Sequence, residues 1–199
     1  MGVDACDEMS KLRVFCAVEL PANVRARAAE HIARLREEAR DARASWERAE
    51  KMHITLKFMG EINQARVFDL QNAAERAVSN VAPFDLSIEG TGAFPPHGLP
   101  RVLWLGVTDA SGGLARLQQR LEDECAREGF APDKKIYHPH LTLARLRQPA
   151  DAKRLAALHR EMNFKTDAFS IAELIVLHSE LGPRGSSYTE ISRHHLSAV

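Results

Sequence analysis

The chain has 199 residues, with 27 basic and 27 acidic side chains and therefore a formal net charge of zero. This length fits one domain, or two closely joined lobes, with enough residues to bury a core. The balanced charge excludes a global positive field of the kind that coats nucleic acid, so any phosphate-binding surface must be local. A small anionic ligand held in a cleft fits this composition.

The first half of the chain is predicted to alternate strands and helices. Apolar runs predict the strands, and segments rich in Ala, Arg and Glu with one apolar face predict the helices. Pro21 ends the first strand, and Gly60 ends the strand that begins at His53. In chain order we expect a flexible N-terminus at 1–11, a strand at 13–20, a helix at 22–44, strands at 45–48 and 53–58, and a helix at 64–81.

The second half is predicted to repeat the same types of element. A glycine pair at 112–113 introduces a helix, and Gly129 stops it. In chain order we expect strands at 84–90 and 102–107, a helix to about 127, a strand at 140–146, a helix at 151–162, and long strands at 169–181 and 187–196 around a turn at 182–185. This order predicts an α+β fold with antiparallel sheets rather than a regular parallel wind.

The cysteines and the N-terminal residues bear on the location of the protein. Cys6, Cys16 and Cys125 are widely spaced and odd in number, which favours a reduced, intracellular protein over a disulfide framework. The first residues are acidic and lack the basic-then-apolar order of a signal peptide, and no apolar run reaches membrane-spanning length. We therefore expect a cytoplasmic protein without a membrane partner.

Two matching tetrapeptides, His53-Ile-Thr-Leu56 and His140-Leu-Thr-Leu143, occupy equivalent places in the two halves. Each lies on a predicted strand that is followed by a helix and then by two strands. Random ordering of nine His and six Thr residues yields only about 0.3 His-x-Thr matches. We infer an internal pseudo-duplication that forms two lobes around one cleft, each lobe an antiparallel sheet with helices packed outside.

The residue types in these tetrapeptides point to acid–base chemistry. Alternate side chains of a strand share a face, so each His and its Thr point one way and the aliphatic residues the other. One imidazole can be held neutral as a base while the other is protonated as an acid, and Thr offers a hydroxyl donor to a phosphate oxygen. The alternative for either copy alone is a satisfied core histidine.

A metal site is the second alternative for the histidines. The chain offers many imidazole nitrogens, yet no His-Glu-x-x-His, Cys-x-x-Cys or carboxylate-rich loop accompanies them. His138 shares a face with His140 only if the strand continues through Pro139, which we do not expect. His194 and His195 are expected on the surface. We therefore predict no metal and no cofactor.

The chain resembles the two-histidine phosphoesterases, and within them the bacterial and archaeal RNA 2′,3′-cyclic phosphodiesterases, also called 2′-5′ RNA ligases. The resemblance runs from Leu12 over most of the chain. Its motifs are Leu12-Arg-Val-Phe-Cys-Ala-Val-Glu-Leu-Pro21, the two tetrapeptides with their flanks, Gly92-Ala-Phe-Pro95, Arg101-Val-Leu-Trp-Leu-Gly106 and Ser179-Glu-Leu-Gly-Pro183. It implies a single bilobal α+β domain over 12–199 with both His-x-Thr motifs in the cleft.

The resemblance also implies a role for six residues. These are His53 as proton donor, His140 as proton acceptor, Thr55 and Thr142 as phosphate ligands, Arg145 for the phosphate charge, and Phe58 for stacking on a base. Strict alternation would turn Phe58 and Arg145 away from the cleft, so each strand must end or bulge before them. Otherwise Phe58 is a core aromatic and Arg145 a surface cation.

The implied activity is hydrolysis of a terminal 2′,3′-cyclic phosphate to a 2′-phosphomonoester without a metal. The implied partners are RNA ends or nucleoside 2′,3′-cyclic phosphates, and a monomer is expected. Joining of RNA ends through a 2′-5′ linkage by the same residues is the first alternative. A non-catalytic module that binds RNA ends is the second. The near-symmetry of the two motifs leaves the acid and base roles interchangeable on the sequence alone.

Overall fold

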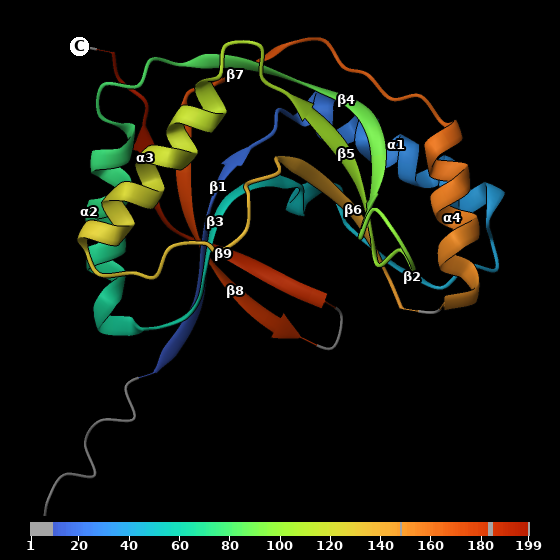
Figure 1. Ribbon diagram of the computed structural model, residues 1–199, viewed down its shortest axis with the longest axis horizontal. Coiled ribbons are helices and arrows are strands. Elements are labelled where there is room, and N and C mark those ends of the chain that lie inside the picture. The colour runs from blue at the N-terminus through green and yellow to red at the C-terminus, as the bar shows by residue number, and fades with distance from the viewer. Residues whose placement is uncertain (1–9, 148, 183–184, 199) are drawn as a thin grey trace, which may run out of the picture.

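The structure is a computed structural model that describes residues 10–147, 149–182 and 185–198. It confirms the α+β class (Figure 1). The strands are β1 (Lys11–Glu19), β2 (Ala44–Trp46), β3 (His53–Asn63), β4 (Phe84–Phe94), β5 (Val102–Thr108), β6 (His140–Leu146), β7 (Phe169–Ile171), β8 (Glu173–Gly182) and β9 (Gly185–His195). The α-helices are α1 (Ala22–Glu38), α2 (Val67–Val78), α3 (Gly113–Arg127) and α4 (Pro149–Glu161), with 3₁₀ turns at Ala49–Lys51 and Gln64–Arg66.

The nine strands of the described residues join one curled antiparallel sheet with β3 and β6 at its centre. One half consists of β3, β1, β8 and β9, and the other of β6, β5, β4 and β7. The short β2 pairs with the end of β6. Among the described residues, the ladder between β3 and β6 consists of the pair of Ile54 with Leu141, so the two histidine strands lie where the two halves of the sheet meet. We call these halves of the sheet lobes.

Each lobe draws strands from both halves of the chain. The unit β1–α1–β3 resembles the unit β5–α3–β6. In each unit the helix connects two strands that lie side by side in the sheet. A strand after the next helix then crosses to the other lobe: β4, which follows α2, pairs with β5, and β8, the second strand after α4, pairs with β1. The lobes are therefore interlocked, and this exchange gives a physical reason to expect them to behave as one unit.

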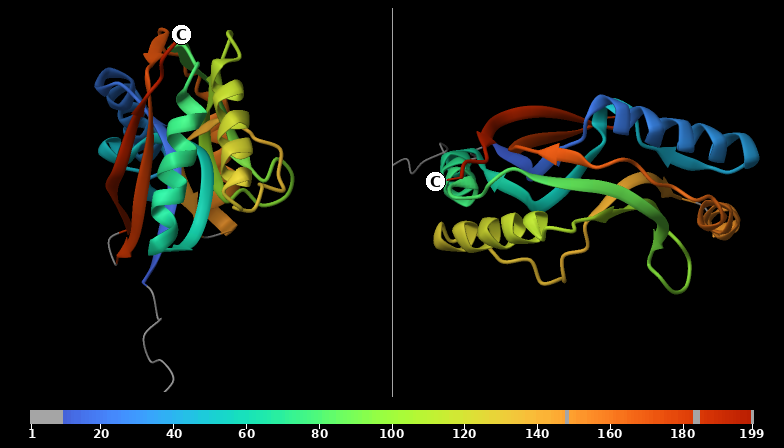
Figure 2. Two further views of the ribbon diagram at one scale, coloured as in Figure 1. Left: turned by 90° about the vertical axis from the view of Figure 1, so that its left-hand side faces the viewer. Right: turned by 90° about the horizontal axis from the view of Figure 1, so that it is seen from above.

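The helices pack in two pairs at opposite ends of the sheet (Figure 2). Helices α2 and α3 lie side by side at one end, and α1 lies near α4 at the other. Helix α1 buries a stripe at helical spacing, namely Val24, Ala28, Ile32 and Leu35. Val24, Ala28 and Ile32 belong to the same apolar cluster as Ile54 and Leu141, so the side chains that alternate with the histidines anchor the central strands to the core.

Several predicted boundaries are wrong. The first helix ends at Glu38 rather than at 44, since the last residues of the predicted helix turn away to form β2 against β6. Strand β3 continues past Gly60, whose φ is +69°, to Asn63. The predicted strand at 169–181 is two strands, because β7 pairs with β4 while β8 pairs with β1.

The expected flexible N-terminus falls outside the described residues for 1–9, and β1 already begins at Lys11. The expected turn at 182–185 is described only at its two ends. Within the described part of the chain, no helix is both long and apolar enough to cross a membrane.

Candidate functional site

Equivalent bulges in β3 and β6 turn extra side chains toward the histidines. The pairing of β3 with β1 skips Leu56, and the pairing of β6 with β5 skips Leu143. Each skipped residue comes three positions after the histidine of its strand. A bulge reverses the alternation of side chains, so Phe58 and Arg145 line the same cavity as the histidines. Of the two expected possibilities, an end or a bulge of the strand before Phe58 and Arg145, both strands show the bulge.

The central strand pair sets the relative position of the two histidines. Ile54 of β3 pairs with Leu141 of β6 in antiparallel register. Continued by one residue on either side, this register places the histidine of each strand across from the threonine of the other. The two histidines are then diagonal neighbours, with Cβ atoms about 7 Å apart. That spacing leaves room for one phosphate group between the rings.

The ring of His53 is fixed by its backbone and by aromatic neighbours. Nδ1 lies 2.7 Å from the carbonyl oxygen of Lys51, which can only accept, so Nδ1 carries the proton. The centroid of the Phe15 ring lies 4.8 Å from that of His53, and Tyr188 meets the imidazole edge-on at 5.2 Å. These contacts hold the ring with its Nε2 free for a ligand.

The ring of His140 is held in the same way in the other lobe. Nδ1 lies 2.7 Å from the carbonyl oxygen of His138 and donates to it. Phe94 meets the imidazole edge-on at a centroid distance of 5.1 Å, and Trp104 lies at 6.4 Å. The two imidazoles therefore share one tautomer and one kind of support, on β1 and β9 in one lobe and on β4 and β5 in the other.

The two rings differ in the charges around them. Burial lowers the pKa of both His53 and His140. For each, the hydrogen bond to a backbone carbonyl raises the pKa in part. His140 lowers the pKa of His53 and the carboxylate of Glu19 raises it to a lesser extent, whereas His138 and Arg145 lower the pKa of His140. Apart from the effect of one ring on the other, the charged group that acts on His53 is therefore an anion, and those that act on His140 are basic.

All six residues singled out from the sequence line one cavity of about 220 Å³. The complete lining is Glu47, Lys51, Met52, His53, Thr55, Phe58, Phe94, Val102, His140, Thr142, Arg145 and Tyr188. Phe58 is 51% exposed, and its ring packs on Phe15 at 5.4 Å, so it is a cavity wall rather than a core aromatic. Arg145 is exposed and belongs to the same lining as both threonines.

The sequence did not reveal three polar members of the cavity. Lys51 donates to the carbonyl of Ser186, which ties the start of β3 to β9. Burial raises the pKa of Glu47, and burial likewise raises that of Tyr188. Tyr188 comes from the far end of the chain, and no motif marks any of the three. Only the pairing of β1 with β8 and of β8 with β9 brings Tyr188 to His53.

Within the described part of the chain, no three or more His, Cys, Asp or Glu side chains are grouped so that they could hold a metal ion. His138 precedes β6 and does not share its strand. The expectation of a surface position is wrong for His194, which is buried and contacts Glu75 at 2.6 Å through Nδ1. His195 is 76% exposed at its side chain, as expected.

The amino-acid sequence is similar to those of known proteins. The profile of the 2′-5′ RNA ligase superfamily matches residues 24–183. A Methanothermobacter thermautotrophicus protein named RNA 2′,3′-cyclic phosphodiesterase is 33% identical over 184 residues, which cover 91% of this chain and 97% of the relative.

Solved structures show the same fold. A Thermus thermophilus protein superimposes with a TM-score of 0.78 at 27% identity and covers 93% of this chain and 98% of its own. Escherichia coli LigT, crystallised with 3′-AMP, superimposes with a TM-score of 0.71 at 26% identity and covers 94% of this chain and 99% of its own. The correspondence thus extends over nearly the whole chain.

Proposed function

The chain belongs to the 2′-5′ RNA ligase superfamily, and from this we propose that it hydrolyses the 2′,3′-cyclic phosphate at the end of an RNA to a 2′-phosphomonoester. Relatives that carry the name RNA 2′,3′-cyclic phosphodiesterase support this reaction. So does the cavity, which is wide enough for one phosphate and a sugar and offers two imidazoles, two hydroxyls and a guanidinium.

In the proposed reaction the two imidazoles move one proton each. Neutral His140 accepts a proton at Nε2 from a water molecule, whose oxygen attacks phosphorus. The bond between phosphorus and the 3′ oxygen breaks, and His53, as imidazolium, donates its Nε2 proton to that oxygen. One water is consumed, and the products are a 2′-phosphate and a free 3′-hydroxyl. Each Nδ1 proton stays on its carbonyl throughout and keeps the ring aimed at the cavity.

The observation that carries this assignment of roles is the asymmetry of charge around two otherwise equivalent rings. Glu19 stabilises the imidazolium form of His53, while Arg145 and His138 disfavour that form of His140. An anionic substrate between the rings raises the pKa of both. The ring that also has a carboxylate nearby is then the first to take up a proton as the pH falls. The acid is therefore His53 and the base His140.

The remaining residues act on the phosphate and the base. Thr55 and Thr142 lie across from the histidines and donate hydroxyl hydrogen bonds to the non-bridging oxygens. Arg145 stabilises the negative charge that builds on those oxygens as water attacks. Phe58 offers the exposed face of its ring to the terminal base.

Adenosine 2′,3′-cyclic phosphate is the substrate that tests the proposal. The protein should convert it to adenosine 2′-phosphate, because His53 protonates the 3′ oxygen. Release of the 3′-phosphate would reverse the proposed geometry, and absence of any product would refute hydrolysis. A parallel incubation of a cyclic-ended oligonucleotide with a 5′-hydroxyl acceptor measures joining, and a joined product in excess of the monoester would favour the ligase alternative.

A further inference from the structure

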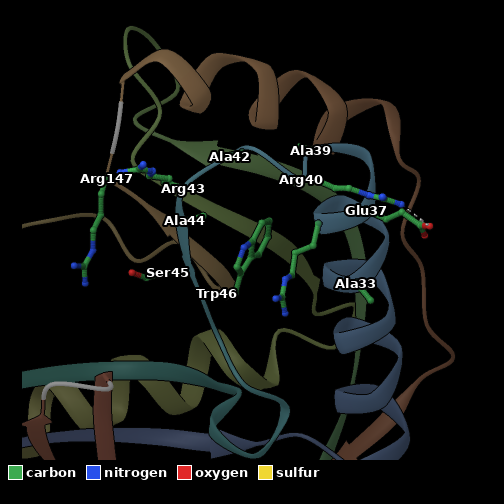
Figure 3. A pocket seen from close by; sticks show the side chains of 11 residues that line it. Ala33, Glu37, Ala39, Arg40, Ala42, Arg43, Ala44, Ser45, Trp46 and Arg147 are labelled. Carbon is green, nitrogen blue, oxygen red and sulfur yellow. Dashed lines mark ion pairs between the residues drawn. The ribbon is translucent and has the colours of Figure 1, made fainter.

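A second hollow, distinct from the catalytic cavity, lies between helix α1 and strand β2 (Figure 3). Its volume is about 860 Å³, and its polar lining is dominated by Arg36, Arg40, Arg43 and Arg147. The ring of Trp46 stands between α1 and the side chain of Arg147. We propose that this arginine surface binds the single-stranded RNA that leads to the cyclic phosphate, an inference that rests on the proposed function for the place of the RNA end.

The arginine surface has little carboxylate to neutralise it. Glu37 is the only acidic lining residue among those described, and its contact with Arg40, at 3.6 Å, joins two side chains that are more than 70% exposed. Exposed pairs of this kind are weak and exchange readily with another anion. The guanidinium groups of Arg36 and Arg43 have no carboxylate within ion-pair distance in the described structure, so the surface is positive in a chain of zero net charge.

The arginine surface is continuous with the catalytic cavity. A third hollow, of about 630 Å³, shares Trp46 and Arg147 with the arginine surface. It also shares Phe58 and Arg145 with the catalytic cavity. Arg13 contributes a further cation to this connecting hollow. Glu47 is the one acidic side chain in the described lining of this hollow, and five basic side chains accompany it, namely Arg13, Arg48, Lys51, Arg145 and Arg147. A chain of phosphates can therefore leave the reactive end and reach Trp46 along a mainly cationic lining.

The sequence of side chains along this path matches single-stranded RNA. Aromatic rings at Phe58 and Trp46 offer stacking faces, and arginines lie beside each of them. Sequence-independent binding of single strands combines such stacking faces with a positive groove. An acidic protein segment would pair with the arginines, but its binding would not require aromatic stacking faces or a surface that continues into the catalytic cavity.

The length of the path predicts which substrates use it. From Thr142 to Arg147 strand β6 and the residue beyond it advance by about 16 Å, at about 3.3 Å per residue. A nucleoside cyclic phosphate bound at the threonines cannot reach the arginine surface, whereas an oligonucleotide can. We therefore expect an oligonucleotide to have a higher kcat/KM than the mononucleotide, with the difference arising in KM.

The test compares two double variants on two substrates. The variant Arg36→Gln/Arg43→Gln removes two charges from the arginine surface. The control Arg116→Gln/Arg127→Gln removes two exposed charges from α3, at the other end of the sheet. The substrates are adenosine 2′,3′-cyclic phosphate and an RNA of about eight nucleotides that ends in the same group.

We expect the arginine-surface variant to lose about tenfold in kcat/KM on the oligonucleotide and nothing on the mononucleotide, while the control keeps both. The slope of log(kcat/KM) against log[salt] for the oligonucleotide should become shallower by about 1.4, since each phosphate contact on a single strand contributes about 0.7. Trp46→Leu, which keeps an apolar side chain but removes the stacking face, should lose about fivefold or more on the oligonucleotide alone. Equal losses on both substrates, or none on either, would overturn the inference while leaving the hydrolysis intact.

A binding measurement keeps the inference testable if hydrolysis fails. The probe is a 5′-fluorescein-labelled RNA of about eight nucleotides with a 3′-phosphate, followed by anisotropy. Weaker binding by the arginine-surface variant than by the α3 control supports the surface, and identical binding by both refutes it. If only the proposed function fails, the cyclic phosphate will remain unreacted, but the arginine-surface variant will still bind the RNA more weakly than the α3 control.

Discussion

Mild acid should weaken the packing of α1 against α4, because a buried pair of histidines joins the two helices. Nε2 of His31 lies 3.0 Å from Nδ1 of His159, and Nε2 of His159 donates to the carbonyl of Trp104 at 2.9 Å. The carbonyl requires a proton on Nε2 of His159, so its Nδ1 accepts from His31 and both rings are neutral. Neither ring is exposed to solvent.

The size of the effect follows from the pKa of His31, which burial and the neighbouring His159 lower to about 4. The unfolded chain takes up this proton below pH 6.5, whereas the folded chain resists it until about pH 4. The stabilisation is therefore complete above pH 6.5 and is lost as the pH falls toward 4. The full loss is about 3 kcal/mol, of which about 2 kcal/mol is gone by pH 5.

Urea unfolding at pH 7, 6 and 5 measures this loss directly. The variant His31→Leu should lose about 2 kcal/mol less than the wild type over that range, whatever its stability at pH 7. The matched control is His97→Gln, since His97 is exposed in the loop after β4, and it should follow the wild type. Parallel pH dependences for wild type and His31→Leu would refute the buried neutral pair.

Three further predictions concern the catalytic cavity. Because burial lowers the pKa of His53 and His140, we expect kcat/KM to be highest below pH 6.5. The optimum of kcat should lie at a higher pH, because bound phosphate raises the pKa of His53. Full pH profiles in which both parameters share an optimum near pH 8 would contradict this prediction. Dialysis against a chelator should leave the turnover of adenosine 2′,3′-cyclic phosphate unchanged, and a loss restored by added zinc would favour the metal alternative. Arg145→Gln should lower kcat by about a hundredfold with little change in the melting temperature, and steady-state kinetics that show only a higher KM would assign Arg145 to binding alone.

The fold class and the positions that meet in the cavity could be predicted because they depend on local patterns. Alternation along two short apolar strands places each histidine and threonine on one face. The need for Phe58 and Arg145 to share that face predicted a break in alternation, and the bulges at Leu56 and Leu143 supply it. The duplicated order of elements predicted two lobes around one cleft.

The parts that escaped prediction depend on contacts between distant segments. The first helix was expected to run to 44 because Ala and Arg favour helices, but pairing of Trp46 with Ala144 draws the chain into β2. The strand at 169–181 divides because its two parts pair with different partners. Tyr188 reaches His53 only through the β1–β8–β9 order, which no local pattern encodes.

Turnover by two single variants tests the proposed acid–base pair most directly. His53→Gln and His140→Gln should each lower kcat on adenosine 2′,3′-cyclic phosphate by at least about a hundredfold, because each removes one proton transfer. Circular dichroism and the melting temperature should stay close to those of the wild type, since both rings face the cavity rather than the core. Retention of more than about a tenth of wild-type kcat by either folded variant would contradict the pairing of His53 as acid with His140 as base.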